Sequence, residues 1–450
     1  MTRPLKNLAI RLLNISPISV HSVFTPATAA EANYVSRPEL ENIIVSELDT
    51  QGKQILLFGH SGSGKTTIIR SIVKSKGLEY IRTHCEKATT YADIIRDGFD
   101  KLDHYYLNEK TISEKQALSA QVAADIKVIK SQIVASTESS EANKYTRILP
   151  PQLTPQRLAQ MIGESGLIWI IEDFHKVEEI EKKRIADLLK FFCDIANDYP
   201  QSKIVCIGAC ESANELVALE PNLKGRVSEI HVSLLSEEAI RAIAENGFEL
   251  LNISADKELI DQVVFYSARL GSTAHQMCLD ICNGIGVSKR SWKEIKVNSN
   301  AFNHAVKGFI KKNEGTLSVI YEAAVKDEVG WYILKTLSNN KHEKLQLREI
   351  CKIINMGKKQ FKSEEVYSKL VELATQEYGV VYYNPKTENF SIASPFWRSF
   401  LRMQFAMEAA KKNTKSPVGL NLKDQNDIEA IVEKMMLELL NKYSQMYSSK

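Results

Sequence analysis

The sequence predicts an α/β chain in which a parallel sheet with helices on both faces is followed by an all-helical region and a winged-helix domain. Short apolar runs alternate with helical segments as far as residue 232, which is typical of a parallel sheet. From Ser236 to about Gly286 the apolar residues recur at helical spacing. Between Val329 and Phe405, three helical segments precede "GVVYYNPKTENFSIA", whose alternating apolar residues around an Asn-Pro turn indicate a hairpin.

The elements of the first region can be expected in order. A helix begins after Ser36, because serine caps a helix and Pro38 fits its first turn. The further strands expected are Gln54–Phe58, Leu78–Thr83, Leu167–Ile171, Lys203–Ile207 and Glu229–Val232, and the further helices are Lys65–Lys76, one from Thr89, and Glu179–Ile195.

The same patterns divide the chain. We expect a leader (1–30), a core (31–235) with a helical insertion (106–150), a helical lid (236–300), a winged-helix domain (301–410) and a C-terminal loop and helix (411–450). The insertion has a helical apolar stripe, which fits either a surface hairpin or a contact with a partner.

Composition limits the classes of function. A chain of 450 residues fits two or three domains, and its formal net charge of +3 identifies no nucleic-acid partner, so any such contact must come from a local patch. Its seven cysteines lie mostly in apolar stretches, which is typical of reduced thiols. With neither a signal peptide nor a membrane span evident at the N-terminus, we expect a cytoplasmic protein without membrane contact.

A phosphate-binding loop follows the first strand. Gly59-His60-Ser61-Gly62-Ser63-Gly64-Lys65-Thr66 fits the pattern G-x-x-x-x-G-K-[ST]. Glycines let the backbone N–H groups converge on phosphate oxygens, and the following helix directs its positive end at them. We therefore expect ATP here, bound by residues 59–67 including Thr67. Lys65 would face the β- and γ-phosphates, and Thr66 would ligate Mg²⁺.

A second strand supplies carboxylates. In "GLIWIIEDFHKV" the apolar run ends at Glu172 and Asp173, and the carboxyl end of a parallel strand lies beside the phosphates. By position we assign Mg²⁺ to Glu172 and the attacking water to Asp173, although the two roles can be exchanged. His175 fits two interpretations equally, a group that contacts the γ-phosphate or water, and a loop residue that caps a helix.

Together these motifs resemble AAA+ and STAND-type P-loop ATPases, and most of all origin-recognition-like bacterial AAA ATPases with a C-terminal winged helix. The resemblance covers about residues 30 to 405. It implies that Arg37 lies near the adenine and that Glu211 or Ser212 senses the γ-phosphate. It also implies that Arg226, in "NLKGRVSEI", reaches the γ-phosphate of a neighbouring subunit, so that hydrolysis requires a homo-oligomer. The alternative for Arg226 is a surface ion pair.

The third helix of the winged-helix region has mixed charge. Lysines lie on it, just before it and at the hairpin tip, and could contact phosphates; they are Lys358, Lys359, Lys362, Lys369 and Lys386. Glu364, Glu365 and Glu372 share the helix and would repel DNA. Contact with DNA and contact with protein therefore both stay open.

The leading hypothesis is a slow, assembly-dependent ATPase. In it, Lys65, Glu172, Asp173 and a neighbour's Arg226 act on MgATP in a switch that regulates a partner effector, and the resemblance extends this context to bacterial anti-phage defence. The alternative is a DNA-binding AAA+ initiator or transposition-type regulator. A third hypothesis is a nucleotide-binding scaffold without turnover.

Overall fold

A computed structural model describes residues 18–112, 154–209, 223–357, 359–375 and 377–412. They form two compact units. One spans residues 27–235, and the other runs from residue 236 onward together with the segment that ends at Pro26. None of the described helices is both long enough and apolar enough to cross a membrane.

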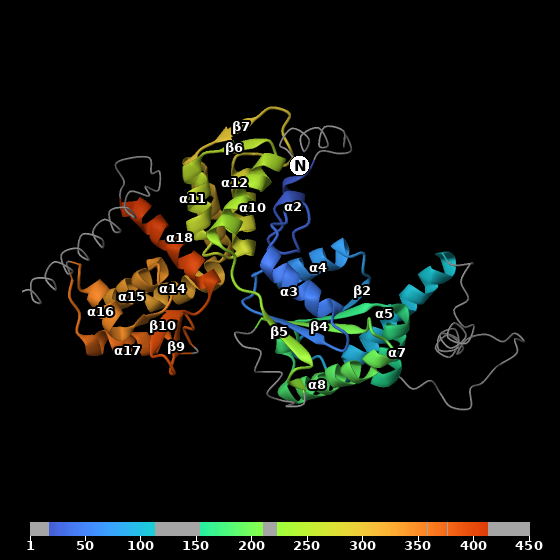
Figure 1. Cartoon of the computed structure of the whole chain (residues 1–450). Coiled ribbons are helices and arrows are strands. Elements are labelled where there is room, and N and C mark those ends of the chain that lie inside the picture. The colour runs from blue at the N-terminus through green and yellow to red at the C-terminus, as the bar shows by residue number, and fades with distance from the viewer. Residues whose placement is uncertain (1–17, 113–153, 210–222, 358, 376, 413–450) are drawn as a thin grey trace, which may run out of the picture. The chain divides into compact units, whose positions relative to one another are not determined.

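A five-stranded parallel sheet forms the centre of the first unit (Figure 1). Its strand order is β2 (Tyr80–His84), β3 (Ile168–Glu172), β4 (Lys203–Gly208), β1 (Gln54–Phe58) and β5 (Val227–His231), and every neighbouring pair is parallel. The parallel sheet predicted from the sequence is therefore confirmed. Two strands, β2 and β5, differ by about two residues from the expected ranges, because their apolar runs are short and partly exposed.

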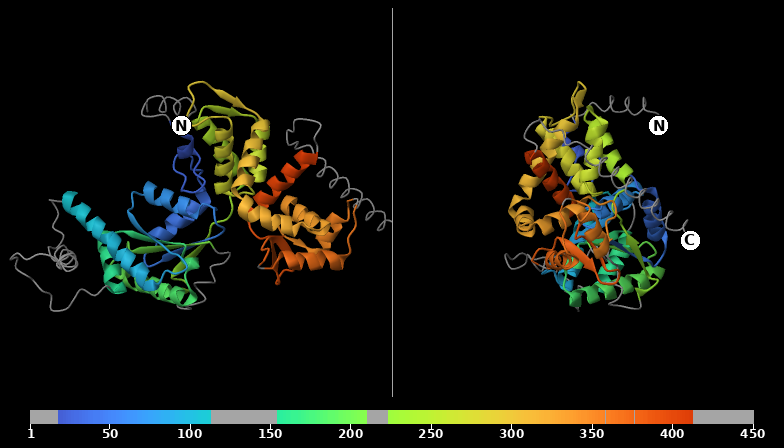
Figure 2. Two further views of the ribbon diagram at one scale, coloured as in Figure 1. Left: turned by 180° about the vertical axis from the view of Figure 1, so that it is seen from behind. Right: turned by 90° about the vertical axis from the view of Figure 1, so that its left-hand side faces the viewer.

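Helices cover both faces of this sheet (Figures 1 and 2). On one face lie α3 (Pro38–Asp49) and α4 (Lys65–Ser75), whose side chains pack on Ile168 and Ile170 of β3. On the other lie α5 (Tyr91–Ile112), α7 (Pro155–Ser165) and α8 (Glu179–Asp194), next to the short 3₁₀ turns η1 (Phe174–Lys176) and η2 (Ile195–Asn197). Strand β3 thus contributes to two cores, which explains why its sequence is apolar at consecutive positions.

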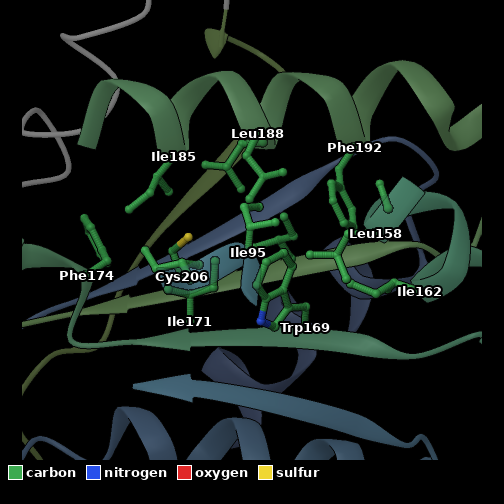
Figure 3. Packing of buried hydrophobic residues seen from close by; sticks show 14 of the residues in the cluster. Ile95, Leu158, Ile162, Trp169, Ile171, Phe174, Ile185, Leu188, Phe192 and Cys206 are labelled. Carbon is green, nitrogen blue, oxygen red and sulfur yellow. The ribbon is translucent and has the colours of Figure 1, made fainter. Parts of the chain in front are cut away.

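Trp169 lies in the second of these cores (Figure 3). Its ring packs 6.2 Å from that of Phe192 of α8, and both side chains are fully buried. The indole N–H donates to the Thr83 hydroxyl of β2 (2.9 Å), so the polar atom of this buried side chain has a partner. Residues of α8 and α7 complete the packing and fix the strand that ends at Glu172.

The second unit begins with a group of helices at residues 237–312, which we call the lid although the predicted lid ended at residue 300. It contains α10 (Glu237–Leu250), α11 (Lys257–Tyr266), α12 (Gly271–Gly284), the turn η4 (Ser299–Ala301) and α13 (Phe302–Lys312). The expectation of helix throughout residues 236–286 is wrong at β6 (Ile253–Ala255), which pairs in parallel with β7 (Ile295–Val297). The helix stops because Asn252 adopts a left-handed conformation, with φ 61°, just before a β-branched isoleucine.

The segment before Pro26 packs within this lid. Its helix α2 (Val20–Val23) is followed by Phe24, which is fully buried and makes an edge-on contact with Phe248 of α10. The next backbone N–H, that of Thr25, donates to Nδ1 of His275 (3.2 Å) on α12. His275, Cys278 and Cys282 are all buried, as packing residues of a lid core would be.

The rest of the second unit holds α14 (Val319–Ala324), preceded by the π-helical turn η5 (Glu314–Ser318), and a small α/β module. The module runs α15 (Glu328–Asn339), β8 (Leu345–Gln346), α16 (Leu347–Ile354), α17 (Ser363–Leu373), β9 (Val381–Asn384) and β10 (Asn389–Ile392). Its antiparallel sheet has the order β8-β10-β9, and α18 (Pro395–Lys412) follows. Three helices and a hairpin occur in the order expected for a winged helix, and we call residues 328–392 the C-terminal module.

Candidate nucleotide-binding site

The loop between β1 and α4 requires glycine. Gly59, Gly62 and Gly64 have φ of 144°, 78° and 92°, in the region that side chains with a Cβ rarely adopt. At Gly59 an added Cβ would also lie 2.4 Å from the carbonyl oxygen of Val232. The backbone of this loop is therefore determined by its own sequence and by the segment after β5.

Lys65 is the first residue of α4, and its side chain folds back over the loop. It is 8% exposed, and its Nζ donates to the carbonyl oxygens of Gly59 (2.8 Å) and His60 (2.7 Å). Beside it, the hydroxyl of Ser63 is buried and has no hydrogen-bond partner among the described residues. A buried cation, an orphaned hydroxyl and a helix N-terminus together fit an anionic phosphate chain.

Thr66 and Glu172 lie close together at the carboxyl edge of the first unit's sheet. The Thr66 hydroxyl, at the start of α4, lies 3.5 Å from Oε2 of Glu172, the last residue of β3. Glu172 is 9% exposed. A hydroxyl and a carboxylate oxygen beside a phosphate site are ligands that Mg²⁺ uses, usually with water and phosphate oxygens completing its octahedron.

Two residues of β2 that the sequence did not point to also face Glu172. Arg82 Nε lies 3.0 Å from Oε1, and His84 Nδ1 lies 3.8 Å from Oε2. They come together because β2 and β3 are neighbours in parallel register, with His84 opposite Glu172. Arg82 and His84, at the end of an expected strand, could have indicated a functional group there. The sequence does not show that β2 and β3 are neighbours, and so it does not predict the contact with Glu172.

Asp173 is oriented differently from Glu172. Its φ of 61° is unusual for a residue other than glycine, and its carboxylate pairs with Lys176 (2.7 Å) while 43% of the side chain stays exposed. The hydrogen bond from Lys176 to Asp173 raises the pKa of this lysine. Of the two carboxylates, Glu172 is the one beside Thr66, and Asp173 is the one open to solvent.

His175 connects two strand ends. Its Nδ1 accepts a hydrogen bond from the backbone N–H of Ala209 (3.1 Å), which follows β4. Since Nδ1 accepts, the neutral ring carries its proton on Nε2. The imidazole therefore links the turn after Glu172 to the end of β4.

Arg37 supports the phosphate loop from outside. Its guanidinium donates to the carbonyl of Ser63 (3.3 Å) and to the carbonyl and hydroxyl of Ser233 (both 2.9 Å). Burial lowers the pKa of this group. Arg37 therefore links the phosphate loop to the segment after β5. The sequence predicted a contact with adenine for this residue and did not predict this link.

Arg226 lies at the opposite edge of the sheet. It precedes β5, and its carbonyl accepts the N–H of Gln54, the first residue of β1, whereas the phosphate loop follows the last residue of β1. Its guanidinium pairs with Asp194 (2.6 Å), and both side chains are about half exposed. Arg226 therefore lies away from the phosphate loop of its own chain, and its surface ion pair is the one that the alternative prediction described. Action on the γ-phosphate of a neighbouring subunit stays a prediction.

Thr67 lies beside a pocket of about 600 Å³ on the outer side of α4. Glu31 borders this pocket and pairs with Arg70 (3.3 Å) and Lys74 (3.1 Å). Several predicted features lie outside the described residues, namely Glu211, Ser212, Lys358, most of the 106–150 insertion and nearly all of the 411–450 segment.

Comparison with known proteins agrees with this geometry. A family profile described as "ATPase family associated with various cellular activities (AAA)" matches residues 55–234. Residues 55–234 are an AAA ATPase domain. ATP hydrolysis is the activity of this domain, and the matched range includes the loop of residues 59–66 and the strand that ends at Glu172.

Relatives of the whole chain are distant. An ORC1-type DNA replication protein of Desulfurococcus amylolyticus is 21% identical over 355 residues, which is 78% of this chain and 77% of that protein. Among solved structures, a Walker-type ATPase of Pyrococcus abyssi is similar with a TM-score of 0.49 and 14% identity, over 84% of this chain and 99% of that one. The ORC2 protein of Aeropyrum pernix, in complexes titled ADPNP-ADP, is similar with a TM-score of 0.43 and 14% identity, over 87% of this chain and 98% of that one.

Proposed function

We propose that this chain is an ATP-dependent DNA-binding protein of the origin-recognition type, in which the AAA domain binds MgATP and the C-terminal module contacts duplex DNA. The observation that carries the proposal is the reach of the ORC1-type similarity. It extends over 355 residues, far beyond the 55–234 range of the AAA domain, and so includes much of the second unit. The regulation of an effector, in anti-phage defence or elsewhere, stays a prediction.

At the nucleotide, the residues act by position and charge. Lys65 and the N–H groups at the start of α4 hold the phosphates, and Thr66 and Glu172 would hold Mg²⁺. When bound, the metal neutralises charge on the β- and γ-phosphate oxygens. Asp173, whose carboxylate is open to solvent, orients and deprotonates the attacking water, and Arg226 of a neighbouring subunit stabilises charge on the γ-phosphate.

In the C-terminal module, the lysines available to DNA are fewer than the sequence predicted. Lys369 is 8% exposed and pairs with Asp327 and Glu372 (both 2.8 Å), so the expectation that it contacts a phosphate is wrong. The helix turns this side chain inward, toward the start of α15. Lys362, by contrast, occupies the N-cap position of α17 without a side-chain hydrogen bond to the helix and is exposed, as is Lys386 between β9 and β10.

We therefore place the duplex contact at one end of α17 and at the hairpin tip. The N-terminus of α17 favours a phosphate, and Lys359 lies just before it, paired with Glu328. This arrangement positions a duplex through its backbone, although Glu364 and Glu365 lie in the first turn of α17 and oppose the phosphate with their charge.

A second candidate, a protein partner, is favoured by the exposed face of α17 itself. Glu364 and Glu365 are exposed there, and so are Tyr367 (47%) and Val371 (46%). Tyr382 of the hairpin adds another exposed aromatic ring (43%). An acidic and aromatic surface suits a basic partner protein better than it suits DNA.

A duplex titration decides between the two candidates. Fluorescence anisotropy of a labelled duplex is followed with ATP or ADP over a range of salt concentrations. We expect binding whose logarithm falls steeply with log[salt], and a K359E/K362E/K386E variant that loses it. K307E, which makes one such charge reversal on the exposed face of α13, is the control for a single substitution and should bind as wild type. Absence of duplex binding at low salt with ATP would contradict the proposal and favour a protein partner.

A further inference from the structure

The lid displays a tryptophan in solvent. Trp292 is 95% exposed and lies in the segment of residues 288–296, a loop together with the first two residues of β7, which we call the lid loop. Tryptophan carries more apolar surface than most side chains and is usually well covered, so this exposure is unusual. The loop lies at the end of the lid helices, beside β6 (Figures 1 and 2).

The charge of this loop is strongly positive. Its nine residues, "SKRSWKEIK", include four cationic side chains and one carboxylate, so its formal charge of +3 equals that of the whole chain. Lys289, Lys293 and Lys296 are exposed, and they form no ion pair with other described residues. Because the net charge of the chain is small, any contact with nucleic acid must come from a local basic patch, and this loop is such a patch.

Backbone hydrogen bonds hold the loop in place on both sides of Trp292. They are Val20 N–H to Ser288 O (3.0 Å), Arg290 N–H to Ile18 O (2.8 Å), Ser291 N–H to Leu251 O (3.1 Å) and Ile295 N–H to Asn252 O (3.1 Å). The Ser291 hydroxyl also accepts the N–H of Lys293 (3.2 Å). Because the backbone is fixed, presenting the indole to a partner costs little conformational entropy.

The chemistry of the loop fits one kind of partner. An exposed aromatic ring between ammonium groups can stack on a nucleobase while the ammonium groups contact the phosphates beside it. Bases in a duplex already stack on one another, so a free base face is found on unpaired nucleotides. We propose that residues 288–296 are a binding site for single-stranded nucleic acid, in which Trp292 stacks on a base and Lys289 and Lys293 bind the flanking phosphates.

This site goes beyond the proposed function, which concerns duplex DNA and the C-terminal module. It is tested on the full chain by titrating oligothymidine while tryptophan emission is recorded. Trp169 is fully buried, and comparison with W292F isolates the signal of Trp292 from those of Trp331 and Trp397. We expect oligothymidine to quench the emission of wild type and to leave that of W292F nearly unchanged.

Two variants separate stacking from charge. W292A should bind oligothymidine about tenfold more weakly at all salt concentrations, since base–aromatic stacking is what it removes. K289A/K293A should lower the slope of log K against log[salt] by about 1.4, about 0.7 for each ammonium group lost. The K359E/K362E/K386E variant should keep wild-type affinity for the single strand, which separates this site from the C-terminal module.

Two control ligands can overturn the proposal. An abasic oligonucleotide of the same length keeps the phosphates and removes the bases, so binding equal to that of oligothymidine would contradict stacking. Phosphatidylserine vesicles that shift Trp292 emission to the blue, without any effect of oligothymidine, would point to a membrane surface instead. Quenching by the single strand without duplex binding would sustain this site and contradict the proposed function alone, so the two can fail separately.

Discussion

The phosphate loop and the C-terminal module both place a lysine at the N-terminus of a helix, but they differ in burial. Lys65 is 8% exposed, bonds to two carbonyls of its own loop and follows glycines with positive φ. Lys362 is exposed and precedes a helix with exposed glutamates. A buried site is determined by its backbone and admits one kind of ligand, whereas an exposed one depends on all the charges around it.

The largest expected effect is the removal of the buried cation. Lys65→Ala leaves the phosphates without their main counter-charge in a site of low solvent access. We expect ATP affinity and turnover to fall by at least 100-fold, since a single buried charge contact in such a site contributes several kcal/mol. Lys76→Ala, at the other end of the same helix and paired at the surface with Asp49 (2.9 Å), should leave both unchanged. Both variants are measured by nucleotide titration and phosphate release. Equal effects would contradict the claim that the buried lysine binds the phosphates and the surface lysine does not.

The next largest effects are expected from the two carboxylates, Glu172 and Asp173, whose substitutions should change different properties. Asp173→Asn keeps the left-handed backbone, which asparagine tolerates, and removes the base. We expect turnover to fall about 10²- to 10⁴-fold while ATP affinity is kept. Glu172→Gln should instead weaken the dependence of binding on Mg²⁺. Unchanged phosphate release in Asp173→Asn would reject its assignment, and release lost only in Glu172→Gln would exchange the two roles.

Arg226 extends the comparison between buried and exposed cationic residues, because it is exposed but is predicted to act at the buried phosphate site of a neighbouring subunit. Arg226→Ala should keep ATP binding and lower turnover in the assembled protein by about 10³-fold, the scale of an arginine finger. Mixing it with the Lys65→Ala protein should restore part of the activity, since one subunit supplies the loop and the other the arginine. Asp194→Ala removes the ion-pair partner alone. If it lowers turnover as much as Arg226→Ala and mixing restores nothing, the arginine has only a surface role.

The smallest effect concerns burial in the second unit. Burial lowers the pKa of His275 to about 4 from an ordinary value of 6.5, and its Nδ1 accepts the Thr25 N–H. The unfolded chain therefore binds more protons than the folded chain between these values. Stability contributed by this group is complete above pH 6.5 and is lost as the pH falls toward 4, by about 1.4 kcal/mol per pH unit. Urea unfolding of wild type and His275→Gln should show this slope in wild type alone, and equal slopes in both would contradict it.

Much of the first unit could be predicted from the sequence because its signals are local. The phosphate loop is a contiguous motif, and the strand that ends at Glu172 is apolar at consecutive positions since both its faces are buried. Arg82 and His84 could not be predicted, because their proximity to Glu172 depends on which strands are neighbours. Long-range pairing of this kind leaves no periodic signal in the sequence.

The second unit was harder for related reasons. Strand β6 has three residues, too few for a period of two to be visible, and its partner β7 follows about 40 residues later. The inward turn of Lys369 depends on Asp327, which precedes a different helix of the module. Trp292 was not singled out, because a single tryptophan in a sequence does not show whether it is covered.

The central claim is that MgATP is held between the Lys65 loop and the Thr66–Glu172 pair, and a crystal structure with MgATP or a slowly hydrolysed analogue tests it most directly. We predict Lys65 Nζ within hydrogen-bond distance of the β- and γ-phosphate oxygens, with the metal bound to the Thr66 hydroxyl and close to Glu172. A nucleotide bound elsewhere, with Lys65 still donating to the carbonyls of Gly59 and His60, would contradict the account.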